Sequence, residues 1–185
     1  MEFLEPAASR LRPWLTAPAA CAALTLPTEP APEVDRNLFL LATSFGSREQ
    51  LATLLKVSPD VVTALEDARQ VISFVAASQS YPLFGLFQAL PGVAGQPLSA
   101  ILGRFFETID AGDAWMDARD IASFFRVPTR LLVWATPLEV LLGHRLYDAV
   151  PEREASWLFL QSPEFRLGAV LGAAKDELQH RRASR

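Results

Sequence analysis

The sequence contains very few of the residues from which metal centres, disulfides and common catalytic sites are built. Its 185 residues include one cysteine, Cys21, and two histidines, His144 and His180. A single cysteine cannot form an intramolecular disulfide, and it is compatible with a reducing cytoplasm. These three residues also lack the spacing of a zinc site. We therefore expect neither a bound metal nor a cofactor.

Sequence motifs of common enzyme classes are missing as well. There is no glycine-rich phosphate-binding loop and no nucleophile elbow. A group of aspartates between residues 110 and 120 departs from the spacing of a calcium-binding EF-hand loop. We interpret these aspartates as helix caps and linker residues. They are Asp110, Asp113, Asp117 and Asp120. The sequence predicts a protein that is not an enzyme.

Long apolar runs and a positive net charge are also absent. No run reaches the roughly 18 consecutive apolar residues that cross a bilayer. The first residues, MEFLEP, are acidic where a secretion signal is basic. We therefore expect a cytoplasmic protein with no membrane partner. The net charge is −4, so nucleic-acid binding would require a local group of basic residues.

What the chain does contain is a helical pattern from Asp35 onward. Hydrophobic residues make up 50% of the sequence, as in a well-packed globular protein. Sustained two-residue alternation and hairpin signals such as Asn-Gly are lacking. Residues 1–35 hold several prolines, which favour an extended arm, although a short helix over Phe3 to Leu15 is an alternative. The predicted fold is all-α, preceded by a proline-rich arm over residues 1–35.

Two stretches of the helical region match each other position by position. LATLLKVSPDVVTAL begins at Leu51, and IASFFRVPTRLLVWA begins at Ile121. Two later pairs of segments also match, LFGLFQALPGV with SWLFLQSPEF and PLSAILGRF with RLGAVLGAA. Because a self-match at a fixed period indicates a duplicated unit, we infer two tandem helical repeats of about 70 residues. Their ranges are 36–112 and 113–181, followed by a basic tail at 182–185.

Each matching stretch has the pattern of a helix-turn-helix. Ala52 and Ala122 supply the small residue that two steeply crossing helices need where their backbones approach. Apolar residues follow at the turn and along the inner face of the second helix. The glycine common in such turns is replaced by Lys56 and Arg126. This pattern occurs in DNA-binding proteins and in purely structural helical hairpins.

A DNA-binding function would depend on the outward face of the second helix of each pair. In the first repeat this face carries Asp60, Glu66 and Asp67, which phosphate would repel. The second repeat is basic in and around the corresponding segment. Its candidate DNA-contacting residues are Arg119, Arg126, Arg130 and Arg145. The alternative is that these arginines form a solvated face whose side-chain stems cover apolar surface.

The order of the segments resembles that of the Xre/MbcA/ParS-like antitoxin family. In that family a helix-turn-helix precedes a toxin-binding segment that contains a tryptophan, a proline, a glycine, Pro-Leu and an apolar helix. The first repeat follows this order through Pro91, Gly95, Pro97, Leu98 and Leu102, with Phe84 or Phe87 at the tryptophan position. The second repeat has the tryptophan, Trp157, but lacks the Gly and Pro-Leu elements. The resemblance implies a helical, often dimeric protein that binds a toxin, with operator binding as a further property.

Two functional hypotheses follow from these observations. The first is a DNA-binding or antitoxin-like regulatory protein with tandem helix-turn-helix repeats. The alternative is a helical protein-interaction module that does not bind DNA. The order of the motifs favours the first hypothesis, and the negative net charge favours the second. We also predict a homodimer, because the stretch FVAASQSYPLFGLF is more apolar than a small monomer can cover.

Overall fold

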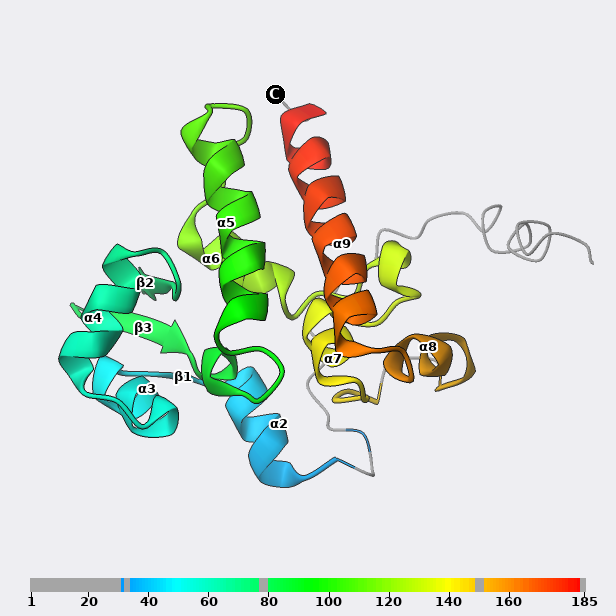
Figure 1. Cartoon of the computed structure of the whole chain (residues 1–185), viewed down its shortest axis with the longest axis horizontal. Coiled ribbons are helices and arrows are strands. Elements are labelled where there is room, and N and C mark those ends of the chain that lie inside the picture. Colours follow the sequence, from blue (N-terminus) through cyan, green and yellow to red (C-terminus); the bar gives the residue numbers. More distant parts are fainter. Residues whose placement is uncertain (1–30, 32–33, 77–79, 149–151, 184–185) are drawn as a thin grey trace, which may run out of the picture.

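The computed structural model describes residue 31 and residues 34–76, 80–148 and 152–183. The chain is mostly helical, as predicted (Figure 1). Most of the expected N-terminal arm, including the alternative helix over Phe3 to Leu15 and Cys21, lies outside the described residues. Ala31 is buried, and its N–H donates to the carbonyl oxygen of Leu146 at 3.0 Å.

The first part of the chain combines helices with three short strands. Its longest helix, α5, lies beside α9 of the second part (Figure 1). In chain order the elements are α2 (Arg36–Thr43), β1 (Phe45–Gly46), α3 (Arg48–Leu55), α4 (Pro59–Asp67), β2 (Ser73–Val75), β3 (Pro82–Gly85), the 3-10 helix η2 (Leu86–Ala89) and α5 (Gln96–Asp110).

The second part of the described chain is helical. Its last helix, α9, is also its longest, and α8 lies next to the N-terminal end of α9 (Figure 1). The elements are α6 (Ala118–Phe124), the 3-10 helix η3 (Arg130–Leu132), α7 (Pro137–Leu142), α8 (Glu152–Phe159) and α9 (Pro163–Ala183).

A small antiparallel sheet is the first departure from the all-α prediction. Its strand order is β1-β3-β2, with Phe45 opposite Gly85 and Phe74 opposite Leu83. The strands are only two, three and four residues long. Because a period of two becomes recognisable only over about four to eight residues, these strands left no pattern in the sequence.

The helix-turn-helix expected in the first repeat is present as α3 and α4. A capping box opens α3: the Ser47 side chain accepts from the Gln50 N–H, and the Gln50 side chain accepts from the Ser47 N–H. Lys56 ends α3 in the left-handed conformation, with φ 58°. Val62 of α4 is completely buried. The local signals in this stretch therefore predicted its structure.

The corresponding stretch of the second repeat has a different local fold. Helix α6 opens with a capping box between Asp117 and Asp120, in parallel with α3. Where α4 would be expected, only the 3-10 helix η3 forms, and Val133 next to it is left-handed with φ 55°. Pro137 then starts α7, so Thr136 before it is extended. In this stretch the two predicted repeats therefore share only their first helix, α3 in one and α6 in the other. The structure does not show the predicted tandem repeat.

A single cluster of buried hydrophobic residues runs through both predicted repeats. Helix α5 of the first part packs against α9 of the second part, which in turn contacts α7 (Figure 1). The two halves therefore stabilise each other through a shared core. The buried residues of the two long helices are Leu98, Ile101, Leu102 and Phe105 of α5 and Val170, Ala173, Ala174 and Leu178 of α9.

Candidate functional site

Two of the four candidate arginines cover a pair of phenylalanines on the sheet. The rings of Phe45 in β1 and Phe74 in β2 meet edge to face, with centroids 5.1 Å apart. The guanidinium carbon of Arg119 lies 5.6 Å from the Phe74 centroid, and that of Arg126 lies 5.2 Å from the Phe45 centroid. Cation–π contacts are attractive at these distances. Arg119 and Arg126 therefore help to attach α6 and the segment after it to the sheet.

Arg126 is also partly buried, and its Nε has no hydrogen-bond partner in the described residues. Its charge acts on Tyr147, whose ring is buried in the core. Burial raises the pKa of the Tyr147 hydroxyl above 10.0; Arg126 opposes this shift and the Glu139 carboxylate adds to it. Arg126 thus belongs to the interior of the fold as much as to its surface.

A buried carboxylate, which the sequence analysis missed, connects α7 to the loop after it. One oxygen of Glu139 accepts from the N–H and hydroxyl of Thr136, at 2.8 and 3.0 Å. The other accepts from the N–H groups of Leu146 and Tyr147, at 2.9 and 3.1 Å. Both oxygens are satisfied, as a buried carboxylate requires. The Thr-x-x-Glu spacing from Thr136 to Glu139 is a capping-box signal that could have revealed this contact.

The other two candidate arginines have separate partners. The guanidinium carbon of Arg130 lies 5.3 Å from the ring centroid of Trp134, and Arg130 is exposed. The Arg145 side chain is only 10% exposed and binds the carbonyl and carboxylate oxygens of Asp148, at 3.1 and 3.3 Å. All four predicted arginines therefore make contacts within the fold. Half of them, Arg126 and Arg145, do not lie on an exposed face.

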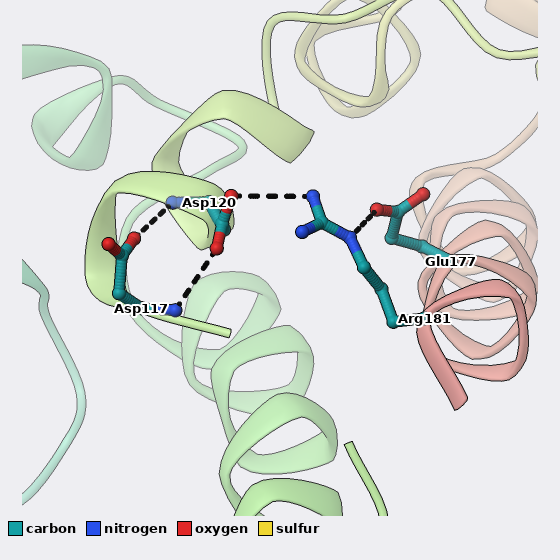
Figure 2. Close-up of polar contacts among 4 residues, drawn as sticks. All are labelled: Asp117, Asp120, Glu177 and Arg181. Atoms are coloured by element: carbon teal, nitrogen blue, oxygen red, sulfur yellow. Dashed lines mark hydrogen bonds and ion pairs between the residues drawn. The ribbon is translucent and has the colours of Figure 1, made fainter. Parts of the chain in front are cut away.

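The aspartates near α6 act as caps and as ion-pair partners. Asp117 and Asp120 exchange the two hydrogen bonds of the capping box, at 2.8 and 3.2 Å. Figure 2 shows that Asp120 also faces Arg181 of α9, with an O–N distance of 3.3 Å. Arg181 binds Glu177 as well, at 2.9 Å. The predicted capping role is confirmed for Asp117 and Asp120, and their cluster also connects α6 to α9.

Arg181 and Arg182 are part of α9, so the predicted basic tail begins inside this helix, and its last two residues, 184–185, lie outside the described residues. The helix continues to Ala183, and Arg182 pairs with Asp113. Asp110 of the same acidic cluster pairs with Arg69. Within the described ranges, no group of three or more His, Cys, Asp or Glu side chains could hold a metal ion. These acids instead balance nearby arginines.

Three large apolar side chains remain exposed on α8, just after it and at the start of α9. Leu160 is 86% exposed, and Trp157 and Phe165 are 49% and 51% exposed. The rings of Trp157 and Phe165 contact each other edge to face, with centroids 6.4 Å apart. We call these three residues the α8 surface. The exposed ring pair, together with the exposed Leu160 three residues after Trp157, indicates an interaction surface.

A groove of about 390 Å³ borders the α8 surface. It lies between the start of α2, the loop after α7, and α8. Its lining is mainly apolar, and Leu160 belongs to both the groove and the α8 surface. The lining residues are Val34, Asp35, Leu38, Gly143, His144, Arg145, Ser156, Phe159 and Leu160.

The apolar stretch on which we based the homodimer is mostly covered within one chain. Phe84 and Phe87 are buried in the core. Val75 and Tyr81 remain exposed, at the end of β2 and just before β3. Strand β2 is an edge strand of the sheet, and such an edge offers unpaired backbone groups to a second chain. The homodimer stays a prediction, now confined to this edge.

Comparison of the chain with protein-family models, with curated proteins and with solved structures found no match. The resemblance to antitoxins therefore stays a prediction from motif order. Within the part of the chain that the structure describes, no helix combines the length and apolar character needed to cross a membrane.

Proposed function

We propose that this protein is a non-enzymatic helical protein-interaction module that binds its partner through the α8 surface. The observation that supports this most strongly is that the contacting rings of Trp157 and Phe165 are both exposed, as is Leu160 directly after α8. Exposing such residues to water is unfavourable, and tryptophan in particular is enriched where protein interfaces bind tightly. The bordering groove adds a concave region that a partner could fill.

The contacts of the arginines favour this function over DNA binding. Arg119, Arg126 and Arg130 would have to leave or share their aromatic partners to reach phosphate. The outward residues of α4 offer no substitute, because Asp60 and Asp67 are exposed acids. The net charge of −4 gives no general attraction to DNA either.

An antitoxin-like role is compatible with the proposed surface. The resemblance places Trp157 in the segment that binds the toxin, and Trp157 is one of the exposed residues of the α8 surface. The partner could thus be a toxin-like protein. This part of the proposal depends on the motif order alone.

A titration with duplex DNA tests the DNA-binding hypothesis directly. We expect no change in the fluorescence anisotropy of a labelled duplex at about 10 µM protein and low salt, within the usual range of non-specific binding. Salt-sensitive binding that weakens in an Arg119→Ala/Arg130→Ala variant would instead support DNA binding.

Site-specific photo-crosslinking tests the proposed surface. A photo-crosslinker in place of Leu160 should form a discrete adduct in cells that contain the natural partner. The matched control carries the crosslinker in place of Asp60, an exposed residue of α4. Adding Trp157→Asp should reduce the adduct, because it places a charge on the surface. Equal adducts at both positions, or none at Leu160, would contradict the proposal.

A further inference from the structure

We propose that a second groove, between α5 and α9, binds the phosphate group of a small phosphorylated molecule. This groove has a volume of about 190 Å³. Its lining is polar apart from one buried leucine, and the charged side chains in the lining are all cations. We call it the α5–α9 groove. Its lining residues are Arg104 and Thr108 of α5 and Lys175, Leu178, Gln179 and Arg182 of α9.

Helical spacing brings the polar side chains of this groove to one place. Lys175, Gln179 and Arg182 follow one another at intervals of four and three residues, which puts them on one face of α9. Arg104 and Thr108 are four residues apart on α5 and share a face in the same way. Because the two helices lie side by side (Figure 1), cations from both helices line the same groove.

The positive charges of the groove differ in how far they are balanced within the fold. Lys175 is exposed and forms no ion pair with any residue that the structure describes. Arg104 has one acid nearby, Glu107, at 3.9 Å, and both side chains are more than half exposed, so this pair is weak. Arg182 pairs with Asp113, and its Nε donates to the Asp113 carbonyl oxygen at 3.3 Å. Lys175 and Arg104 therefore supply most of the charge that a ligand would meet.

The donors of the groove fit a phosphate better than a carboxylate. The Gln179 side chain forms no hydrogen bond within the described part of the chain, so both N–H bonds of its amide can be donated. The Thr108 hydroxyl already donates to the Arg104 carbonyl oxygen at 3.1 Å. A phosphate monoester carries a charge of about −1.5 to −2 and three strong acceptor oxygens. It can therefore bind an arginine, a lysine and an amide together, whereas a carboxylate has one charge and two oxygens.

The surroundings of the groove favour a single phosphate group over a nucleic-acid strand. Glu107 and the exposed Asp176 lie beside Arg104 and Lys175 in the sequence of their helices, and they would repel the neighbouring phosphates of a strand. Arg181 does not extend the basic area, because it pairs with Asp120 of α6 (Figure 2). The net charge of −4 also disfavours a polyanion.

NMR titrations with inorganic phosphate test this inference on the full chain, with acetate at equal ionic strength as the control anion. Phosphate should shift the backbone amide signals of Thr108 and Lys175 and the side-chain amide signals of Gln179. It should bind with a dissociation constant of about 1–10 mM, about tenfold more tightly than acetate, as expected for an additional hydrogen bond between charged groups. Equal affinities for the two anions, or no shift at about 50 mM phosphate, would overturn the proposal.

Variants separate the effect of the groove from a general effect of charge. The double variant Arg104→Met/Lys175→Met keeps the long side-chain stems and removes two charges, so phosphate and acetate should bind equally weakly. Glu107→Gln, at an exposed position, should instead strengthen phosphate binding about twofold, because it removes the acid beside Arg104. Arg36→Met, at an exposed position of α2, is the control for an arginine outside the groove and should bind like the unmodified chain. A tenfold preference for phosphate in the double variant, or weaker binding in Glu107→Gln, would contradict the proposal.

Two further ligands distinguish the sources of the phosphate. Phenyl phosphate should shift the same signals as inorganic phosphate at a similar concentration. If a short DNA duplex shifts these signals at a lower phosphate concentration than phenyl phosphate does, the groove binds nucleic acid and the proposed small ligand is wrong. The α5–α9 groove is separate from the α8 surface, whose residue on α9, Phe165, lies at the start of that helix. A Leu160 photo-adduct without phosphate binding would therefore refute this inference and leave the protein-interaction function intact.

Discussion

Lys56 holds the left-handed backbone conformation that ends α3, with φ 58° and an exposed side chain. Glycine adopts this conformation at lower cost and is the preferred residue there. We therefore expect Lys56→Gly to raise the free energy of unfolding by about 0.5–1 kcal/mol. Urea denaturation of the variant and of the unmodified chain measures this difference in the free energy of unfolding. Lys175→Gly, in the interior of α9, is the matched control and should instead lower stability by about 1 kcal/mol. If Lys56→Gly instead lowers the free energy of unfolding, the Lys56 side chain makes a contact that stabilises the fold by more than its left-handed backbone conformation costs.

Tyr147 should make stability sensitive to alkaline pH. Burial raises the pKa of its hydroxyl above 10.0 in the folded state. The folded state therefore binds this proton more tightly than the unfolded state, and the resulting stability is present below pH 10 and lost as the pH rises through the folded pKa. Tyr147→Phe should therefore lose less stability than the unmodified chain as the pH rises above about 10. Parallel pH profiles of the two proteins would rule this out.

Arg126 and Arg130 should respond differently to the same substitution. Arg126 is partly buried against Phe45 and next to Tyr147, so Arg126→Ala should lower the free energy of unfolding by about 1–2 kcal/mol. Arg130 is exposed, so Arg130→Ala should change it by only about 0.5 kcal/mol or less. Thermal denaturation of the two variants and of the unmodified chain measures the two changes in stability. Equal effects would mean that the contacts of Arg126 contribute little.

At the scale of elements, the pair Asp120–Arg181 connects α6 to α9 across the fold (Figure 2). Both side chains are partly buried, which limits screening by salt. A double-mutant cycle with Asp120→Asn and Arg181→Gln should give a coupling energy of about 0.5–1 kcal/mol. The pair Arg104–Glu107, 3.9 Å apart and more exposed, is the control and should give less. Equal coupling in both pairs would show that the helix–helix link adds no stability.

The dimer prediction belongs to the whole molecule. The edge position of strand β2 and the exposed Val75 and Tyr81 favour pairing with a second chain there. Light scattering at micromolar concentration should give about twice the chain mass of 20.3 kDa. Val75→Asp should restore the single-chain mass, whereas Leu160→Asp should not. A single-chain mass for the unmodified protein would exclude the dimer under those conditions.

The features that the sequence alone determined are local ones. The capping boxes that start α3 and α6, and proline at the first turn of α4, involve residues at most three positions apart. Such contacts form in any context that permits a helix, because they satisfy the free N–H groups at its start. The mostly helical class and the α3–α4 hairpin could therefore be predicted. Pro137 and the Thr136–Glu139 capping box carried the same kind of signal for the start of α7, and recognising it would have excluded a second α4.

The positions of the charges and the apolar surfaces depend on contacts between segments far apart in the sequence. Arg119 and Arg126 find their partners Phe74 and Phe45 far away in the sequence, and those partners come together only because β1 and β2 flank β3. The same long-range packing covers Phe84 but leaves Leu160 in water. Exposure depends on which other segments cover a residue, and spacing along a helix does not contain that information. For this reason the mostly helical class and the α3–α4 hairpin could be predicted from the sequence, whereas the groove and the α8 surface became visible only in the folded chain.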